Sequence, residues 1–382
     1  MNWIALKMLT GDKPKFVGIV FGVTFAALLM AQQASIFCGL MRNTTSQIRD
    51  IYGADIWVMD PGCQFVDDVK PLSDNDLYRV RGVPGVAWAV RLYKGQARAR
   101  FNDGKFQQML ILGLDDATLV GAPREVTLGS IDDLRQPDAV IIDEAGFKYL
   151  WPDAPRESAI GRTFEMNDHR AVIVGLCVAS PTFQTFPVLY CRYTQALSYA
   201  PQERKVLSFV LADPEPGVSS QEVCRRIEER TGLKAQTRHQ FMRTTIVYYL
   251  QRTGIPINFG ITVGLGFVVG AAIAGQTFYL FTIENLKQFG SLKAMGVSNL
   301  RLVRMSLLQA LVVGALGYGL GVGGAALFGV VMEATAKTVP PAFYMMPQIL
   351  AGTGVAVLLI VLLSSVISIR RVLVLEPAIV FK

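Results

Sequence analysis

The stretch TGIPINFGITVGLGFVVGAAIAGQTFYLFTI, residues 253–283, decides the fold. It contains no charged residue, and it is longer than the roughly 20 residues with which an α-helix crosses the hydrocarbon core of a bilayer. A charged side chain near the bilayer centre costs at least about 2.5 kcal/mol on the insertion scale. The stretch therefore predicts a transmembrane helix, and Pro256 either kinks this helix or marks its start.

Three other windows of the chain are equally free of charge. The chain is 51% hydrophobic and only 18% charged, and soluble proteins are about a quarter charged. The apolar stretch after the N-terminus is too long for a signal peptide and predicts a permanent anchor. The four predicted spans cover residues 16–41, 253–283, 305–332 and 347–369.

Basic residues set the orientation of the spans. Most of those near the spans lie in three segments that a four-span chain places on one side of the membrane, whereas the short loop at 333–346 holds only Glu333 and Lys337 as charged residues. The positive-inside rule makes that side cytoplasmic. It predicts an amphipathic N-terminal segment at 1–15, a loop at 284–304 and a tail at 370–382 inside, and an extracytoplasmic insert at 42–252.

The insert has the pattern of a mixed α/β domain of about two small lobes. Asn102-Asp103-Gly104 predicts a hairpin turn between strands at 86–101 and 105–112, and Asn167-Asp168 predicts a second one. Both ends of the insert, 44–52 and 238–251, are expected to be helices that continue the neighbouring spans as a stalk. The other expected elements are strands at 56–59, 139–142, 163–166, 171–178 and 206–211, and helices at 144–150 and 219–230.

No catalytic or metal-binding cluster is expected. The two histidines, His169 and His239, lie about seventy residues apart, and no phosphate-binding loop of the G-x-x-x-x-G-K-[ST] type occurs. The net charge of +7 comes largely with residues that flank the spans, so nucleic acid is not expected as a partner.

Four of the five cysteines lie in the insert, which is expected to face an oxidising compartment. Cys177 and Cys191 flank a proline-containing loop and are the favoured disulfide pair. Free buried thiols are the alternative, because no spacing here is diagnostic.

Glycines recur at intervals of four residues in the second and third spans, a spacing that lets helices approach closely. They form either a dimer seam or ordinary packing within one chain. The pairs concerned are Gly260 and Gly264, Gly266 and Gly270, Gly317 and Gly321, and Gly319 and Gly323.

The segment ENLKQFGSLKAMGVS, residues 284–298, joins the second and third spans. Leu286, Phe289 and Leu292 follow one another at intervals of three, and Met295 continues the series. This pattern predicts a short amphipathic helix that ends near Gly296.

From Glu284 to Arg304 the chain resembles the FtsX/MacB-type ABC transporter permeases (type VII, mechanotransmission), in which a pattern close to E-R-x-x-E-[IF]-G-x-L-[KR]-A-x-G-x-S precedes the third span. The glycine-rich third span and the ending Arg370-Arg371 with Glu376-Pro377-Ala378 also match. The opening residues 12–16 and the run at 54–59 look most like the DevC-like branch. One departure is Gln288, where the pattern has a second acidic residue.

The resemblance implies a permease that dimerises in the bacterial inner membrane and binds a separate ATPase chain, which would hold ATP and magnesium. This chain itself would be non-catalytic and hold no cofactor. The implied ATPase-docking residues are Glu284, Leu286, Lys287, Gln288, Phe289, Gly290, Leu292, Lys293, Met295 and Gly296.

Such a permease would transmit ATPase motion across the membrane to the insert, in an exporter with a HlyD-like membrane-fusion adaptor. The alternatives are an FtsX-like regulator of a cell-wall hydrolase, and a permease that extracts lipoprotein, lipid or haem. The insert of about 210 residues argues against the regulator, whose outer domain is much smaller.

Overall fold

The computed structural model describes residues 2–201, 206–336 and 342–374. The chain divides into two compact units, which are described separately. A helical unit comprises residues 1–39, 254–334 and 342–382, and a sheet unit is built mainly from residues 40–253. The last residues of the predicted tail, with Glu376-Pro377-Ala378, and Lys337 of the short loop lie outside the described residues.

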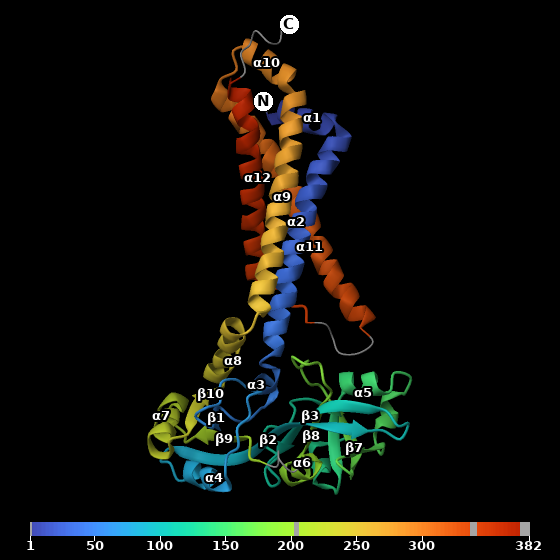
Figure 1. The fold of residues 1–382 in the computed structure, drawn as a ribbon, viewed down its shortest axis with the longest axis vertical. Coiled ribbons are helices and arrows are strands. Elements are labelled where there is room, and N and C mark those ends of the chain that lie inside the picture. The colour runs from blue at the N-terminus through green and yellow to red at the C-terminus, as the bar shows by residue number, and fades with distance from the viewer. Residues whose placement is uncertain (1, 202–205, 337–341, 375–382) are drawn as a thin grey trace. The chain divides into compact units, whose positions relative to one another are not determined.

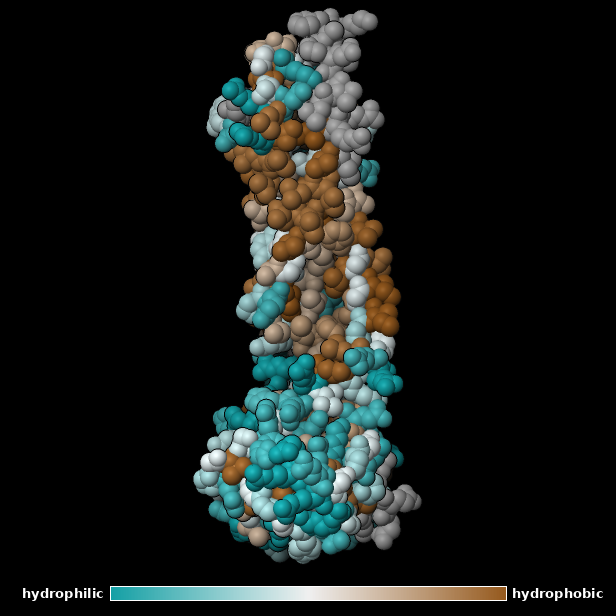
Figure 2. All heavy atoms as spheres, turned by 90° about the vertical axis from the view of Figure 1, so that its left-hand side faces the viewer, coloured by the Kyte–Doolittle hydropathy of each residue, from teal (hydrophilic) through white to brown (hydrophobic). Residues whose placement is uncertain are grey.

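Four helices of the helical unit are long and apolar enough to cross a membrane. Figure 2 shows their surface as mainly hydrophobic, as a lipid-facing surface requires. The four-span expectation is thus confirmed. The four are α2 (Lys13–Asn43), α9 (Ile255–Glu284), α11 (Asn299–Thr335) and α12 (Pro347–Val374), and two shorter helices of this unit are α1 (Asn2–Gly11) and α10 (Leu286–Ala294) (Figure 1).

The helix ends follow local sequence. Pro256 lies in the first turn of α9, where its missing N–H needs no partner, so it marks the start of the helix. The expected continuity of span and stalk is not found. Thr44 and Thr45 separate α2 from α3 (Ser46–Asp50), and Thr253 has an extended backbone after α8 (Arg238–Arg252).

The sheet unit is one ten-stranded sheet in the order β10-β1-β9-β2-β3-β8-β5-β7-β4, with β6 paired to β2 and β7. The expectation of two lobes is wrong, because the 15-residue strand β2 pairs with β9 along its first half and with β3 along its second. The strands are β1 (Ile56–Met59), β2 (Val86–Arg100), β3 (Phe106–Leu114), β4 (Val126–Leu128), β5 (Ala139–Asp143), β6 (Thr163–Met166), β7 (His169–Cys177), β8 (Val188–Arg192), β9 (Phe209–Pro214) and β10 (Lys234–Thr237).

Both predicted hairpins are present. The turn at Asn102-Asp103-Gly104 joins β2 and β3, and Asn167-Asp168 joins β6 and β7 with both residues at positive φ. The strand expected at 206–211 begins later, at Phe209. The remaining helices are α4 (Asp74–Arg81), α5 (Glu144–Leu150), α6 (Tyr193–Tyr199) and α7 (Ser220–Thr231), with 3-10 turns at Ile131–Arg135 and Arg156–Ala159.

Each face of the sheet has its own hydrophobic core, because successive side chains of a strand point to opposite faces. Ile56 and Val58 of β1 lie in one core, and Trp57 and Met59 lie in the other. A sheet buried on both faces is rigid, and it fixes the positions of the groups along its strands.

Candidate functional site

The segment between the second and third spans forms α10, as the spacing of its apolar residues predicts. Its end is a Schellman motif: the Val297 N–H donates to the Leu292 carbonyl over 3.1 Å, and the Gly296 N–H donates to the Lys293 carbonyl over 3.0 Å. Gly296 has φ of +86°, which only glycine adopts without strain. The expected end near Gly296 is confirmed.

One face of α10 is buried within the helical unit. Phe289 is 1% exposed and Leu292 is 8% exposed, and both belong to a small core. Gly290 is also buried, while Leu286 and Lys293 are half-buried. The other buried members of this core are Ala5, Leu302 and Met305.

Helix α1 completes this core through Ala5, a contact with α10 that was not predicted from the sequence. The Gln309 side chain of α11, 2% exposed, donates to the Ala5 carbonyl over 2.8 Å. A single glutamine in an apolar span is the signal that could have predicted such a contact, because a polar group there needs a partner. Helices α1 and α11 thereby hold the buried face of α10.

An ion pair fixes the start of the same region. Lys15 pairs with Glu284 at the end of α9 and with the Asp12 carboxylate, whose Oδ2 is 2.6 Å from Nζ. The hydrogen bond from Lys15 holds the pKa of Asp12 below its usual value. The Glu284 side chain, half of it exposed, is therefore already engaged within the chain.

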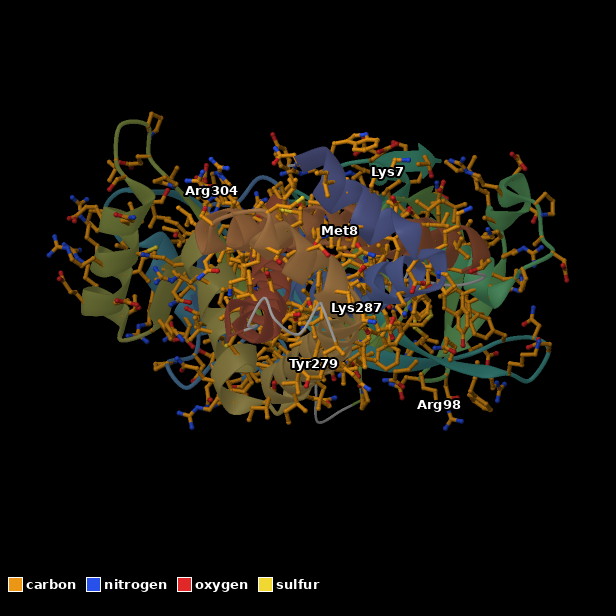
Figure 3. The ribbon with its side chains drawn as sticks, turned by 90° about the horizontal axis from the view of Figure 1, so that it is seen from above. Lys7, Met8, Arg98, Tyr279, Lys287 and Arg304 are labelled. Carbon is orange, nitrogen blue, oxygen red and sulfur yellow. The ribbon has the colours of Figure 1, made fainter. Side chains whose placement is uncertain are left out.

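The opposite face of α10 is exposed, and we call it the outer face. It consists of Lys287, Gln288 and Ser291, together with the flanking exposed residues Glu284, which ends α9, and Met295, which follows α10. Met295 is 72% exposed, which is unusual for a large apolar side chain, and Gly296 beside it is exposed as well. Figure 1 shows α10 at the same end of the helical unit as α1, and Figure 3 labels Lys287, Lys7 and Arg304 in a view from above.

The glycines of the spans divide into two groups. A Cβ at Gly317 or Gly321 would lie 2.6 Å from Val23 or Ala27 of α2, and one at Gly270 would collide with Ala26. A Cβ at Gly266 would lie 3.5 Å from Leu29 of α2, in ordinary van der Waals contact. In contrast, a Cβ would meet nothing within 4 Å at Gly260, Gly264, Gly319 or Gly323.

The favoured disulfide is wrong, since all five cysteines are free. Cys177 ends β7 and Cys191 lies on β8, and β5 separates these two strands. Two strand spacings amount to about 9.5 Å, and a disulfide needs Cα atoms within about 7 Å. The two thiols also belong to cores on opposite faces of the sheet.

Among the described residues, no group of three or more His, Cys, Asp and Glu side chains could hold a metal ion. His169 begins β7, and His239 lies on α8.

Two family models match this chain. The model of the MacB-like periplasmic core domain matches residues 16–230, and that of the FtsX-like permease C-terminal region matches residues 258–377. The first match alone covers more than half of the 382 residues.

Curated relatives match this chain along nearly its whole length. An uncharacterized ABC transporter permease of Mycobacterium tuberculosis, found in strains CDC 1551 and H37Rv, is 25% identical over 373 residues, which cover 94% of this chain and 92% of the relative.

Among solved structures, the periplasmic region of MacB from Actinobacillus actinomycetemcomitans has a TM-score of 0.38 at 14% identity, and covers 52% of this chain and 94% of its own. The extracellular domain of the transporter YknZ from Gram-positive bacteria has a TM-score of 0.33 at 14% identity, with 48% and 98% covered.

Proposed function

This chain belongs to the ABC transporter permeases with a MacB-like periplasmic core domain and an FtsX-like C-terminal region, and we propose that α10 is where its ATPase docks. A permease of this class is a membrane protein that works with an ATPase. In the proposal, ATPase motion enters through the outer face of α10 and passes through the spans to the inserted domain, outside the cytoplasm.

The observation that supports this proposal is the division of α10 into two faces. Phe289 and Leu292 hold the helix against α1 and α11, so a force on the helix is passed on rather than absorbed by local unfolding. The outer face leaves Lys287, Gln288 and Met295 free to meet another protein. An exposed methionine beside polar side chains is well suited to an adaptable protein contact.

The proposal is tested by placing a charge on the outer face without touching the core. Met295→Asp in the full chain is expected to abolish copurification of the ATPase encoded with it and to leave the melting temperature of the permease unchanged. Asn2→Asp is the matched control, because Asn2 is an exposed residue of α1 and an acidic residue suits a helix N-terminus. Normal ATPase binding by Met295→Asp would refute the docking assignment.

We propose that the functional form is a homodimer. The outward row of Gly260 and Gly264 on α9, or of Gly319 and Gly323 on α11, supplies a flat surface for close approach of a second copy. Gly266, Gly270, Gly317 and Gly321 are already used within the chain. A leucine at Gly264 or Gly323 should shift the chain to a monomer in native mass spectrometry, and a dimer that tolerates both would exclude these surfaces.

The location and the further partners are also proposals. The positive-inside pattern supports cytoplasmic termini in a bacterial inner membrane. The DevC-like residues at 12–16 and 54–59 support export with a HlyD-like adaptor, and copurification of an adaptor encoded beside the permease tests this. Copurification of a cell-wall hydrolase instead would favour the regulator.

A further inference from the structure

Six strands of the sheet unit close into a ring. They are β2, β3, β8, β5, β7 and β6, paired in this order, and β6 pairs with β2 again. Both β3 and β6 run antiparallel to β2, so they begin at the end of the ring where β2 finishes. Helix α5 follows β5, and its Phe147 side chain packs in the same core as Phe164 of β6. The open ends of such small barrels are common places for ligand sites.

A cleft of about 440 Å³ lies at this end of the ring, and we call it the ring cleft. It is lined by residues 101–103 of the turn between β2 and β3, by Trp151 at the end of α5, and by residues 161–163 at the start of β6. Its volume is within the range of small-molecule sites. The ring cleft is therefore large enough for a small organic ligand.

One wall of the ring cleft is aromatic and held in place by the core. The rings of Phe101 and Trp151 meet edge to face, with 5.2 Å between their centres. Trp151 also packs on Phe147 at 5.2 Å, and Phe101 packs on Phe164 at 5.4 Å. Because both lining rings are fixed by neighbours behind them, the wall offers a rigid surface to a flat apolar group.

The Arg162 side chain is held in one orientation beside this wall. Its Nε donates to the Ser158 carbonyl over 2.9 Å, and its Nη2 donates to the Ser158 Oγ over 3.1 Å. The guanidinium lies 5.3 Å from the centre of the Trp151 ring. Within the part of the chain that the structure describes, Nη1 has no acceptor and no carboxylate pairs with Arg162. A fixed arginine with donors left over is suited to an anion.

Other residues of the ring cleft also carry donors that the protein does not use. These donors are the Trp151 indole N–H, the Asn102 amide and the Thr163 hydroxyl, and none of them has a hydrogen-bond partner among the described residues. The second charged residue of the lining, Asp103, is paired with Lys105 over 2.8 Å. The ring cleft thus has an excess of donors and one positive charge without a counter-charge.

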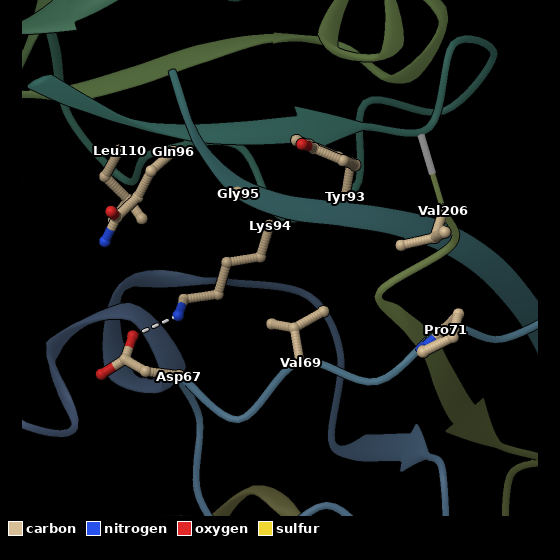
Figure 4. Close-up of a pocket in the computed structure, with 9 residues that line it drawn as sticks. All are labelled: Asp67, Val69, Pro71, Tyr93, Lys94, Gly95, Gln96, Leu110 and Val206. Carbon is tan, nitrogen blue, oxygen red and sulfur yellow. Dashed lines mark hydrogen bonds and ion pairs between the residues drawn. The ribbon is translucent and has the colours of Figure 1, made fainter. Parts of the chain in front are cut away.

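The cleft beside Lys94 lacks such an excess of positive charge. It has a similar volume, about 410 Å³, but its ammonium group is paired with Asp67 (Figure 4). An anion there would have to displace the Asp67 carboxylate. The positive charge of the ring cleft needs no such exchange.

We propose that the ring cleft binds a small organic acid, in which a flat apolar group carries a single carboxylate. The carboxylate pairs with Arg162, since a guanidinium matches its planar geometry. One arginine balances one negative charge, whereas a phosphate group carries about 1.5 to 2. The apolar group packs against Phe101 and Trp151. A free aromatic acid and the C-terminal residue of a peptide share this chemistry.

The ring cleft belongs entirely to the sheet unit. Its ligand binding is measured without any ATPase, so this proposal can fail while the docking on α10 stands, and the reverse also holds.

The probe is 3-phenylpropionate, titrated into the full chain in lipid nanodiscs and followed by tryptophan emission. We expect a saturable change with a Kd of about 5 mM or lower, as for an efficient ligand of this size. The neutral 3-phenylpropionamide is the matched control, and it should bind about tenfold more weakly or worse, because it lacks the charge that pairs with Arg162. Equal binding of the amide, or no saturable change with the acid up to about 5 mM, would overturn the proposal.

Three variants that each lower the net charge by one locate the site. Arg162→Gln removes the guanidinium and should weaken binding about tenfold or more. Asn102→Asp places a carboxylate at the ring cleft and should weaken binding about threefold or more. Lys148→Gln is the control, because Lys148 is exposed on α5 and does not line the ring cleft, and binding should stay unchanged. Equal effects of all three would mean unspecific attraction of anions and would overturn the proposal.

Asn102→Asp also keeps the test decisive if Arg162→Gln fails to fold, because Asn102 lies in an exposed turn. Trp151→Phe keeps an aromatic ring but should remove most of the emission change. An undiminished change in this variant would place the probe elsewhere and refute the assignment.

A second probe distinguishes the two sources of the ligand. N-acetyl-L-phenylalanine carries the same ring and carboxylate with the amide of a peptide end. Tighter binding of this compound than of 3-phenylpropionate would support the proposal with a peptide C-terminus as the ligand. The reverse order would support it with a free organic acid.

Discussion

The buried ion pair between Lys94 and Asp67 in the sheet unit predicts that removing one partner destabilises the protein more than removing the other. Lys94 is 4% exposed on its side chain, whereas its partner Asp67 is 25% exposed and also accepts a hydrogen bond from Tyr249. The two groups therefore differ in how well water can replace a lost partner. We expect Asp67→Asn to be more destabilising than Lys94→Met.

The magnitudes follow from burial. Asp67→Asn leaves an ammonium group inside the protein without its counter-charge, which costs about 3–5 kcal/mol of the free energy of unfolding. Lys94→Met fills a similar volume and leaves a carboxylate that water reaches. The main loss is then the unsatisfied Val66 carbonyl, which costs about 1–3 kcal/mol.

The double variant separates the pair from its surroundings. Once Lys94 is methionine, Asp67→Asn no longer leaves a buried charge without a partner. The free energy of unfolding of the double variant should therefore be close to that of Lys94→Met alone. Its loss should fall clearly below the sum of the two single losses.

Urea unfolding of the full chain in detergent, followed by tryptophan fluorescence, measures these differences. Trp57, Trp88 and Trp151 lie in the sheet unit, and Trp57 is fully buried. An Asp67→Asn variant as stable as Lys94→Met, or strictly additive losses, would refute the view that Lys94 is a buried charge held by Asp67.

Three further predictions concern other parts of the chain. Gly321→Leu should destabilise the detergent-solubilised chain by about 1–3 kcal/mol through overpacking against Ala27. Gly352→Leu, at a position on α12 where a Cβ meets nothing within 4 Å, should leave its melting temperature unchanged, and equal melting temperatures of the two variants would contradict the packing. Burial raises the pKa of Asp143 to about 6. The folded chain then keeps a proton that the unfolded chain releases near pH 4, so the free energy of unfolding should decrease as the pH rises from about 4 to about 6. Melting curves recorded across this range should show the decrease, and Asp143→Asn should make it smaller. All five thiols should react with a maleimide after denaturation without reductant. A measured mass that shows two unreacted cysteines would instead indicate a disulfide.

The features that the sequence predicted correctly depend on neighbours along the chain. The hairpin at Asn102-Asp103-Gly104 and the end of α10 at Gly296 are set by turn chemistry within a few residues. The four spans follow from hydropathy alone. Such local signals are complete in the sequence itself.

The wrong or missing features depend on partners far away in the chain. Cys177 and Cys191 are close in sequence, yet β5, which precedes both, lies between their strands. The two-lobe expectation failed because β2 is long enough to join both halves of the sheet. The burial of Phe289 depends on Ala5, which is almost three hundred residues away.

The burial of Phe289 and Leu292 narrows the chemistry of the proposed ATPase contact. Aspartates at these positions would collapse the core with α1, so a loss of ATPase binding in those variants would not identify the docking surface. Only the outer face of α10 is free to make the contact.

On the outer face, Glu284 is already paired with Lys15, and Gln288 replaces the second acidic residue of the FtsX/MacB-type pattern. Lys287 then dominates the charge of this face, and the ATPase should present an acidic or neutral surface to it. Gln288→Glu should consequently weaken ATPase copurification rather than strengthen it. Stronger copurification would instead indicate that the ATPase contacts an acidic side chain of the permease at this position.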